Sequence, residues 1–195
     1  MNHRNVFRML LFLALVPLAG YKTIDGTNQA LTGPVTANVR QWEQLLQEAT
    51  QVIPAGSSVA GVFGATSPCG AAVRPLHGVA AAGPCDLLNW RLTLYEDTQT
   101  HLPTVFTLAS ESMYFVDNRT IRTTGKRLVT GRWSRNQERT STRVSTVYHL
   151  QGTQQGAFLA LRLIHPALLH PTGPDGTLLV GTAGASYTLS KLKEL

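Results

Sequence analysis

The fold is decided by the stretch Cys85-Asp86-Leu87-Leu88-Asn89-Trp90-Arg91-Leu92-Thr93-Leu94-Tyr95-Glu96-Asp97. Within it, the apolar residues Trp90, Leu92 and Leu94 alternate with more polar neighbours. A period of two residues is typical of a β-strand that buries one face and exposes the other. The stretch follows the second of only two cysteines and opens a series of similar segments, so it predicts an antiparallel β domain in an exported protein.

Similar segments lie on both sides of this stretch, with turn-forming residues between them. We expect strands at residues 59–64, 89–95, 104–108, 112–116, 126–134, 142–150, 158–164, 177–180 and 186–189. No helix-length segments separate them, so the spacing favours a closed barrel or a sandwich of eight or nine short strands. The inward positions are expected to be Trp90, Leu92, Leu94, Phe106, Leu108, Tyr148, Leu159, Leu161 and Leu163, although a one-residue slip of register would exchange the two faces.

The segment before the strands has a different pattern. Residues 21–34 are polar and contain Gly and Thr, as a linker does, whereas 35–52 place apolar residues at helical spacing. Pro54 and Gly56 end this predicted amphipathic helix. We expect its apolar face to cover an open end or a flank of the β domain.

The N-terminus has the features of a secretory signal. Arg4 and Arg8 precede an apolar run at 9–19, which is shorter than the roughly 20 residues of a membrane-spanning helix. The end of the run, Leu18-Ala19-Gly20, matches a lipoprotein signal, but Tyr21 stands where the lipid-bearing Cys would be. The sequence therefore predicts a signal peptide at 1–20, a linker and helix at 21–56 and a β domain at 57–195.

Composition agrees with one β domain of ordinary size. Hydrophobic residues make up 43% of the 195 residues, enough for a core, and only 14% are charged. The formal net charge is +6 and would fall to +4 with the loss of Arg4 and Arg8.

Cys69 and Cys85 allow two interpretations. In an oxidising compartment two cysteines usually pair, and the bridge would close a loop rich in Gly, Ala and Pro. Alternatively, the two thiolates and His77, which lies in the same loop, would form a soft-metal site suited to copper or zinc. The scattered histidines His165 and His170, with Met113, are weaker candidates for such a site, because isolated histidines are commonly surface or turn residues.

Basic residues are concentrated at 119–143, where Glu138 is the single acid. This pattern is compatible with a surface for a polyanion such as lipopolysaccharide or anionic lipid, or simply with the solvated outer faces of two strands. Trp133 is the one aromatic residue in the run, so single-stranded nucleic acid is disfavoured. The candidate polyanion-binding residues are Arg119, Arg122, Lys126, Arg127 and Arg132.

The sequence carries no local catalytic signature. The sequence has no Gly-x-Ser-x-Gly elbow, P-loop or His-Glu-x-x-His, and its acidic residues are scattered without an evident acid–base pair. We therefore expect a protein that is not an enzyme. A hydrolase remains the alternative, since a triad is assembled in space and leaves no fixed sequence order.

Several motifs together carry a resemblance to a known family. They are Gly-x-Phe-Gly-x-Thr-x-Pro-Cys at 61–69, the stretch 85–97, Pro-Thr-Val-Phe-Thr-Leu at 103–108, Gly-Arg-Trp at 131–133, Val-Tyr-His-Leu at 147–150, Leu-Leu-Val-Gly at 178–181 and Ser-Tyr-Thr-Leu at 186–189. In this order they resemble the envelope lipoproteins related to NlpE, over residues 59–192. The resemblance implies a small antiparallel up-and-down β-barrel like that of lipocalins, with roles in surface sensing, envelope-stress signalling and copper tolerance.

Two positions depart from the family pattern. Cys69 matches the first residue of the family's Cys-x-x-Cys, but Val73 and its neighbours supply no second cysteine, and Tyr21 replaces the lipid-bearing Cys. We therefore expect a non-enzymatic protein of the periplasm or outer-membrane envelope. Its expected role is to bind a small apolar ligand or an envelope protein, or to sense stress or copper. No resident cofactor is expected, copper being the one candidate, and association with a membrane surface is a further expectation. If the barrel is wide enough the ligand sits inside it; if side chains fill it, the protein works through its surface.

Overall fold

The computed structural model describes residues 53–117, 120–139, 144–182 and 184–192. The expected signal peptide at 1–20, the amphipathic helix at 35–52 and the candidate residue Arg119 lie outside the described residues.

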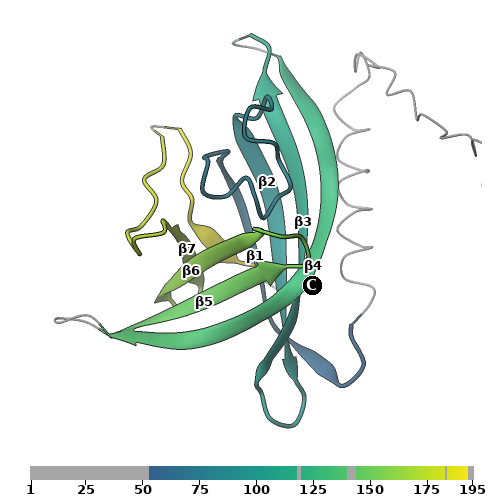
Figure 1. Cartoon of the computed structure of the whole chain (residues 1–195), viewed down its shortest axis with the longest axis vertical. Coiled ribbons are helices and arrows are strands. Elements are labelled where there is room, and N and C mark those ends of the chain that lie inside the picture. Colours follow the sequence, from purple (N-terminus) through teal and green to yellow (C-terminus); the bar gives the residue numbers. More distant parts are fainter. Residues whose placement is uncertain (1–52, 118–119, 140–143, 183, 193–195) are drawn as a thin grey trace, which may run out of the picture. The chain divides into compact units, whose positions relative to one another are not determined.

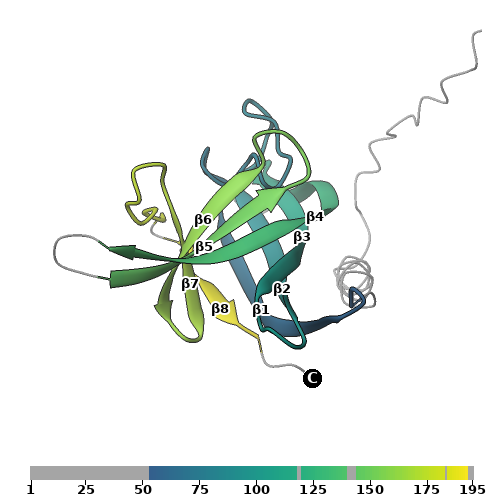
Figure 2. The same cartoon turned by 60° about the horizontal axis from the view of Figure 1, so that its bottom comes forward.

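The described residues form an antiparallel barrel in which each strand pairs with its neighbours in the sequence (Figures 1 and 2). The last strand returns to the first, so the barrel is closed and up-and-down, as the sequence predicts. The eight strands are β1 (Ser57–Pro68), β2 (Leu87–Asp97), β3 (Pro103–Phe115), β4 (Ile121–Arg139), β5 (Val144–Gly152), β6 (Phe158–His165), β7 (Leu168–Thr172) and β8 (Leu189–Lys191).

The longest strand, β4, joins the two halves of the barrel. Its first part pairs with β3, its second part pairs with β5, and Gly131 belongs to both ladders, opposite Phe106 on one side and Gly152 on the other. A Cβ at Gly131 would collide with the backbone carbonyl of Gln151 and lie 2.7 Å from the Phe106 ring. A side chain has no room here, so glycine is required at the position where the two ladders of β4 overlap.

The predicted inward face of the strands is confirmed. Trp90 is opposite Ser110 and Leu92 is opposite Leu108, so these side chains share one face, and that face is the core. Every residue predicted to point inward either belongs to the core cluster or packs against it. Many of the core side chains are 0% exposed, including Leu92, Phe106, Leu108, Leu150, Leu161 and Leu189. They belong to one continuous hydrophobic cluster in the barrel interior.

Two expected strands, 104–108 and 112–116, are in fact one. They form the continuous strand β3, because Ser110 and the neighbouring polar positions still pair with both β2 and β4. Polar residues interrupt the hydrophobic pattern there but do not interrupt the backbone ladder.

The strand expected at 177–180 is absent, and β7 was not anticipated. Residue Leu178 makes only an isolated bridge to Thr172. Pro166 precedes this strand and Pro171 lies within it, and proline cannot donate to a ladder, so the local sequence does not favour a strand here. Pro171 is tolerated because β8 pairs with β7 only at Leu168 and Leu169.

Candidate binding site at the plugged end of the barrel

One end of the barrel is covered by the loop between β1 and β2, here called the plug (residues 69–85). A disulfide joins its two ends, with the Cα atoms of Cys69 and Cys85 5.7 Å apart. The predicted disulfide is therefore confirmed. It holds together the two points at which the chain leaves β1 and enters β2.

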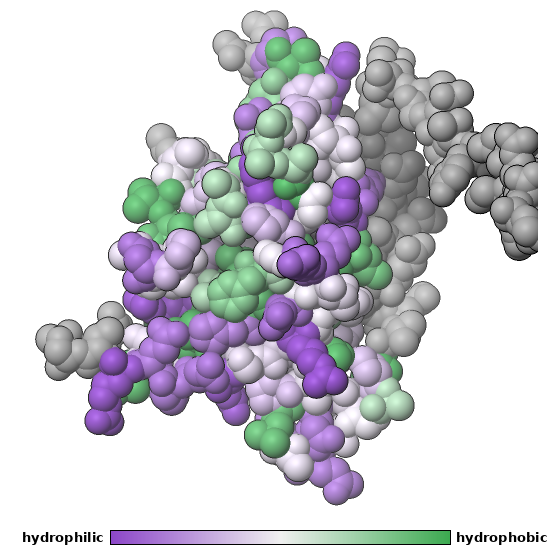
Figure 3. All heavy atoms as spheres, in the orientation of Figure 1, coloured by the Kyte–Doolittle hydropathy of each residue, from purple (hydrophilic) through white to green (hydrophobic). Residues whose placement is uncertain are grey.

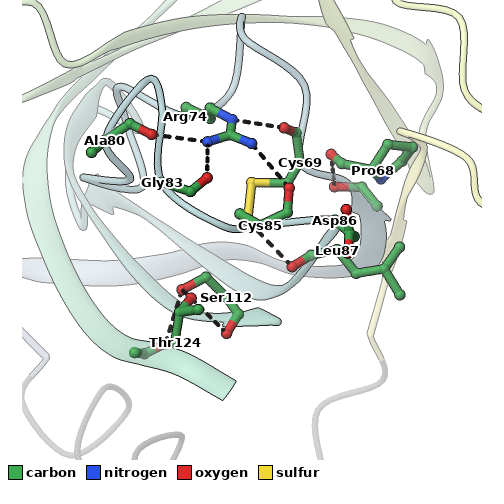
Figure 4. The surroundings of a disulfide bond; sticks show 12 residues. Pro68, Cys69, Arg74, Ala80, Gly83, Cys85, Asp86, Leu87, Ser112 and Thr124 are labelled. Atoms are coloured by element: carbon green, nitrogen blue, oxygen red, sulfur yellow. Dashed lines mark hydrogen bonds between the residues drawn. A yellow bond between two sulfur atoms is a disulfide. The ribbon is translucent and has the colours of Figure 1, made fainter. Parts of the chain in front are cut away.

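Arg74 organises the plug from within (Figure 4). Its guanidinium donates hydrogen bonds to five backbone carbonyls of the loop, at distances of 2.8–3.3 Å. The acceptors are Cys69, Ala80, Ala81, Gly83 and Cys85. A loop this short has no regular ladder, so a side chain with several donors satisfies the carbonyls instead.

The plug packs its apolar side onto the core. Val73 and Leu76 are fully buried, and so is the ring of His77, which meets the indole of Trp90 edge-on with centroids 4.7 Å apart. Neither ring nitrogen of His77 has a hydrogen-bond partner within the described residues. Burial lowers the pKa of His77 from 6.5 to about 3, because the charged imidazolium would lose its hydration there. His77 is therefore held neutral.

The predicted metal site does not take shape in this arrangement. The sulfurs of Cys69 and Cys85 are bonded to each other, so neither is a thiolate ligand while the disulfide is intact. Within the described residues, no group of three or more His, Cys, Asp and Glu side chains is arranged to hold a metal ion. Of the other histidines, His170 has both ring nitrogens engaged, by Thr188 Oγ1 at 2.9 Å and the Leu179 carbonyl at 2.8 Å.

Beside the plug lies an open hollow of about 510 Å³, here called the rim hollow. The plug forms one wall through Ala71, Ala72 and Pro75, and residues 172–174 and Gly176 form another. The strands β5 and β6 form the floor. Most of the lining is apolar, and the volume lies within the range of small-molecule sites in proteins, about 300–1,000 Å³.

Three side chains give the rim hollow its chemistry. The His149 ring stacks on the Phe158 ring, with centroids 5.7 Å apart and planes 24° from parallel. His149 Nε2 lies 3.4 Å from the Glu138 carboxylate. Glu138 is the single Asp, Glu, Lys or Arg side chain among the lining residues, so the hollow combines one negative charge with an aromatic face and apolar walls.

Sequence reasoning did not identify this site. Glu138, His149 and Phe158 come from β4, β5 and β6, and the plug supplies the opposite wall. No local motif connects residues so far apart in the chain. The one available signal was that Glu138 is an isolated acid in a basic run, and that signal has no meaning without the fold.

The predicted polyanion-binding residues do not share one face. Lys126 is on the outer face of β4 and lies 3.7 Å from the Glu111 carboxylate, and Arg132 is on the same outer face. Arg127 is opposite Ser110, on the inward side, where it approaches the plug closely enough that a Cβ at Gly78 would lie 2.7 Å from its Nη1. The register thus divides the run, and polyanion binding stays a prediction.

Arg127 and Lys126 nevertheless border a second hollow. It has a volume of about 410 Å³ and lies between the plug, through Gly78 and Gly83, and the strands β3 and β4. Arg122, the remaining described member of the predicted set, is exposed near the start of β4.

Comparisons with protein-family models, with curated proteins and with solved structures find no match to this chain. The part of the chain that the structure describes contains no helix long and apolar enough to cross a membrane.

Proposed function

We propose that the protein is a non-enzymatic, exported binding protein of the bacterial envelope, NlpE-like in character, which holds a small, largely apolar ligand in the rim hollow. The observation that carries this proposal is the contrast between a barrel interior occupied by buried side chains and an adjacent open hollow of about 510 Å³. A ligand that cannot enter the barrel would still be received between the plug and β5–β6.

The lining indicates what such a ligand would look like. Alanine, proline and leucine side chains offer apolar contact, and the exposed ring of Phe158 offers a flat face. Glu138 and His149 would accept hydrogen bonds from one polar group of the ligand, or donate hydrogen bonds to it. We therefore expect a small molecule with an apolar body and a single hydrogen-bonding or cationic end.

The proposed export is supported by the N-terminal signal pattern and is compatible with the disulfide. A bridge between Cys69 and Cys85 forms and persists in an oxidising compartment such as the periplasm. A copper-sensing role, which the NlpE resemblance implies, would require this bridge to be reduced first. Mass spectrometry with and without thiol alkylation, combined with copper(I) titration, distinguishes the disulfide-bonded protein from a reduced, copper-binding one.

The test of ligand binding is native mass spectrometry of the protein purified from bacterial envelopes. We expect a bound small molecule that is lost in Phe158→Ala and weakened in Glu138→Gln. Val180→Ser is the matched control, since Val180 is 90% exposed and does not line the rim hollow. A ligand retained by both site variants, or no ligand in the unaltered protein at any envelope preparation, would overturn the proposal.

Polyanion binding is the second candidate, favoured by the hollow that Lys126 and Arg127 border. Binding of lipopolysaccharide there would weaken steeply with salt and with Arg127→Gln. The salt dependence distinguishes it from occupancy of the largely apolar rim hollow.

A further inference from the structure

The connection between β3 and β4 carries large apolar side chains that nothing within the described residues covers. Phe115 and Val116 are each 48% exposed and Ile121 is 53% exposed. Phe115 and Ile121 are directly opposite each other in the ladder, so their side chains are neighbours. In Figure 3, apolar side chains gather at the end of the molecule where Figure 1 places this hairpin. We call Tyr114, Phe115, Val116 and Ile121 the hairpin tip.

Hydrogen bonds fix the backbone of the hairpin tip. The Asp117 carboxylate accepts from the backbone N–H and the hydroxyl of Thr120, at 2.7 and 3.1 Å. The Val116 N–H donates to the Thr120 carbonyl at 2.9 Å. The Phe115 N–H donates to the Asp86 carboxylate at 2.8 Å, which ties the tip to the residue that follows the plug. The turn that carries the apolar side chains is therefore ordered. A loose loop is not the reason for their exposure.

Basic residues follow the tip along β4. Arg122 comes directly after Ile121 and is exposed. Lys126 and Arg127 follow four and five residues later in the same strand. The acids nearby are engaged: Asp117 and Asp86 accept the hydrogen bonds above, and Glu111 contacts Lys126. Apolar side chains at the end and cations behind them are the arrangement that suits an anionic bilayer surface.

We propose that the hairpin tip is a membrane anchor that inserts Phe115, Val116 and Ile121 among the lipids of an anionic bilayer while Arg122 contacts the headgroups. Lys126 and Arg127, farther along β4 and on its two opposite faces, add longer-range attraction to the anionic surface. The half-buried Tyr114 lies at the level where amphipathic rings are favoured, between the acyl chains and water. That such a bilayer is available rests on the envelope location proposed above, whereas binding itself is a property of the purified protein.

A lipid surface fits the tip better than a folded protein partner does. Three apolar side chains at the end of a projecting hairpin make a small, convex contact, whereas stable protein interfaces bury about 800 Å² per partner. A bilayer accepts a convex apolar tip without a complementary pocket, and its headgroups supply the negative charge that the basic residues require.

The test is sedimentation of the chain from Tyr21 onward with vesicles of phosphatidylethanolamine and phosphatidylglycerol. We expect binding that Phe115→Ser/Ile121→Ser reduces by roughly tenfold or more, since two large apolar contacts with lipid are lost. Arg122→Gln/Arg127→Gln is expected to reduce it severalfold and to flatten its dependence on salt. Leu102→Ser/Val180→Ser is the matched control, because it removes two apolar side chains elsewhere on the barrel that are even more exposed, at 61% and 90%.

The outcomes divide cleanly. No binding of the unaltered protein to anionic vesicles, or equal losses in the tip and control variants, would overturn the anchor. A dimer in light scattering that Phe115→Ser/Ile121→Ser dissociates would show that the tip contacts a second copy, and would overturn it too. Thermal unfolding of each variant shows that the barrel is intact. Because vesicle binding does not use the rim hollow, its failure leaves the ligand proposal standing, and loss of the ligand leaves the anchor standing.

Discussion

The plug and the hairpin tip lie at the same end of the barrel, but the plug buries its large apolar side chains and the hairpin tip exposes them. The plug buries Val73 and Leu76 against the core and is closed by a covalent bond. The hairpin tip is just as well hydrogen-bonded, yet Phe115 and Ile121 remain exposed. Asp86 connects the two regions, since it follows the plug and its carboxylate accepts the Phe115 N–H.

The difference teaches that local order and burial are separate properties. Hydrogen bonds alone can hold a turn, so an ordered loop needs no apolar cover. When a loop is ordered and its large apolar side chains still point to solvent, stability does not explain them. The plug is thus expected to respond strongly to mutation in measurements of stability, and the tip only in measurements of binding.

Removing the disulfide should have the largest effect on stability. The chain-entropy model gives about 3 kcal/mol for a loop of this size, so Cys69→Ala/Cys85→Ala should lower the free energy of unfolding by that amount. Urea unfolding of the two proteins measures it, and unfolding of the parent with reductant is the control. A loss below about 1 kcal/mol would mean that Arg74 and core packing hold the plug without the bridge.

Arg74 should come next. Arg74→Met keeps the apolar stem but leaves five carbonyls without their charged donor, and we expect a loss of about 2–3 kcal/mol. Arg74→Lys should lose less, because an ammonium still donates to some of them. Combined with the cysteine variants in a double-mutant cycle, the effects should not add, since both act on the same loop.

His77 should make stability depend on pH. Its pKa in the folded protein is about 3, below the 6.5 of an exposed histidine, so protons bind preferentially to the unfolded chain. Its contribution is therefore complete above pH 6.5 and is lost progressively as the pH falls toward 3. Between pH 7.5 and 5 this linkage amounts to about 2 kcal/mol.

The variant His77→Leu removes the titrating group at similar volume. Its free energy of unfolding should fall by about 2 kcal/mol less than that of the parent over the same pH interval. At pH 7.5 it should be at least as stable, because two buried nitrogens without partners are removed. Identical pH dependence in the two proteins would show that His77 is hydrated or partnered in solution.

Much of the barrel could be predicted from the sequence, because alternation directly reports which face of a strand is buried. Trp90, Leu92 and Leu94 indicate the inward face of β2, and the same parity holds on β3 and β6. The pattern failed where proline or polar residues carry strand structure, as in β7 with Pro171 and at the middle of β3 with Ser110. In these two segments, pairing with the neighbouring strands determines the strand structure, and the local sequence carries no information about that pairing.

The candidate site was less predictable than the fold. The disulfide followed from the count of two cysteines, but the rim hollow depends on how the plug lies beside β5 and β6. The basic run looked continuous in the sequence, yet alternation sends Arg127 to one face and Arg132 to the other. Register, which divides the run, is set by pairing with β3.

The smallest effect on stability should come from the hairpin tip, and it is the sharpest test of the contrast with the plug. Phe115→Ser/Ile121→Ser removes two large side chains, which in a buried setting would cost several kcal/mol, about 2–5 for each. Because both are about half exposed and their turn is held by Asp117 and Asp86, we expect a change of at most about 0.5–1 kcal/mol in urea unfolding. A loss as large as that of the plug variants would show that the tip is covered in solution and is part of the fold. A small loss of stability accompanied by weakened vesicle binding would mean that the exposed side chains of this ordered hairpin contribute to membrane binding and not to the stability of the fold.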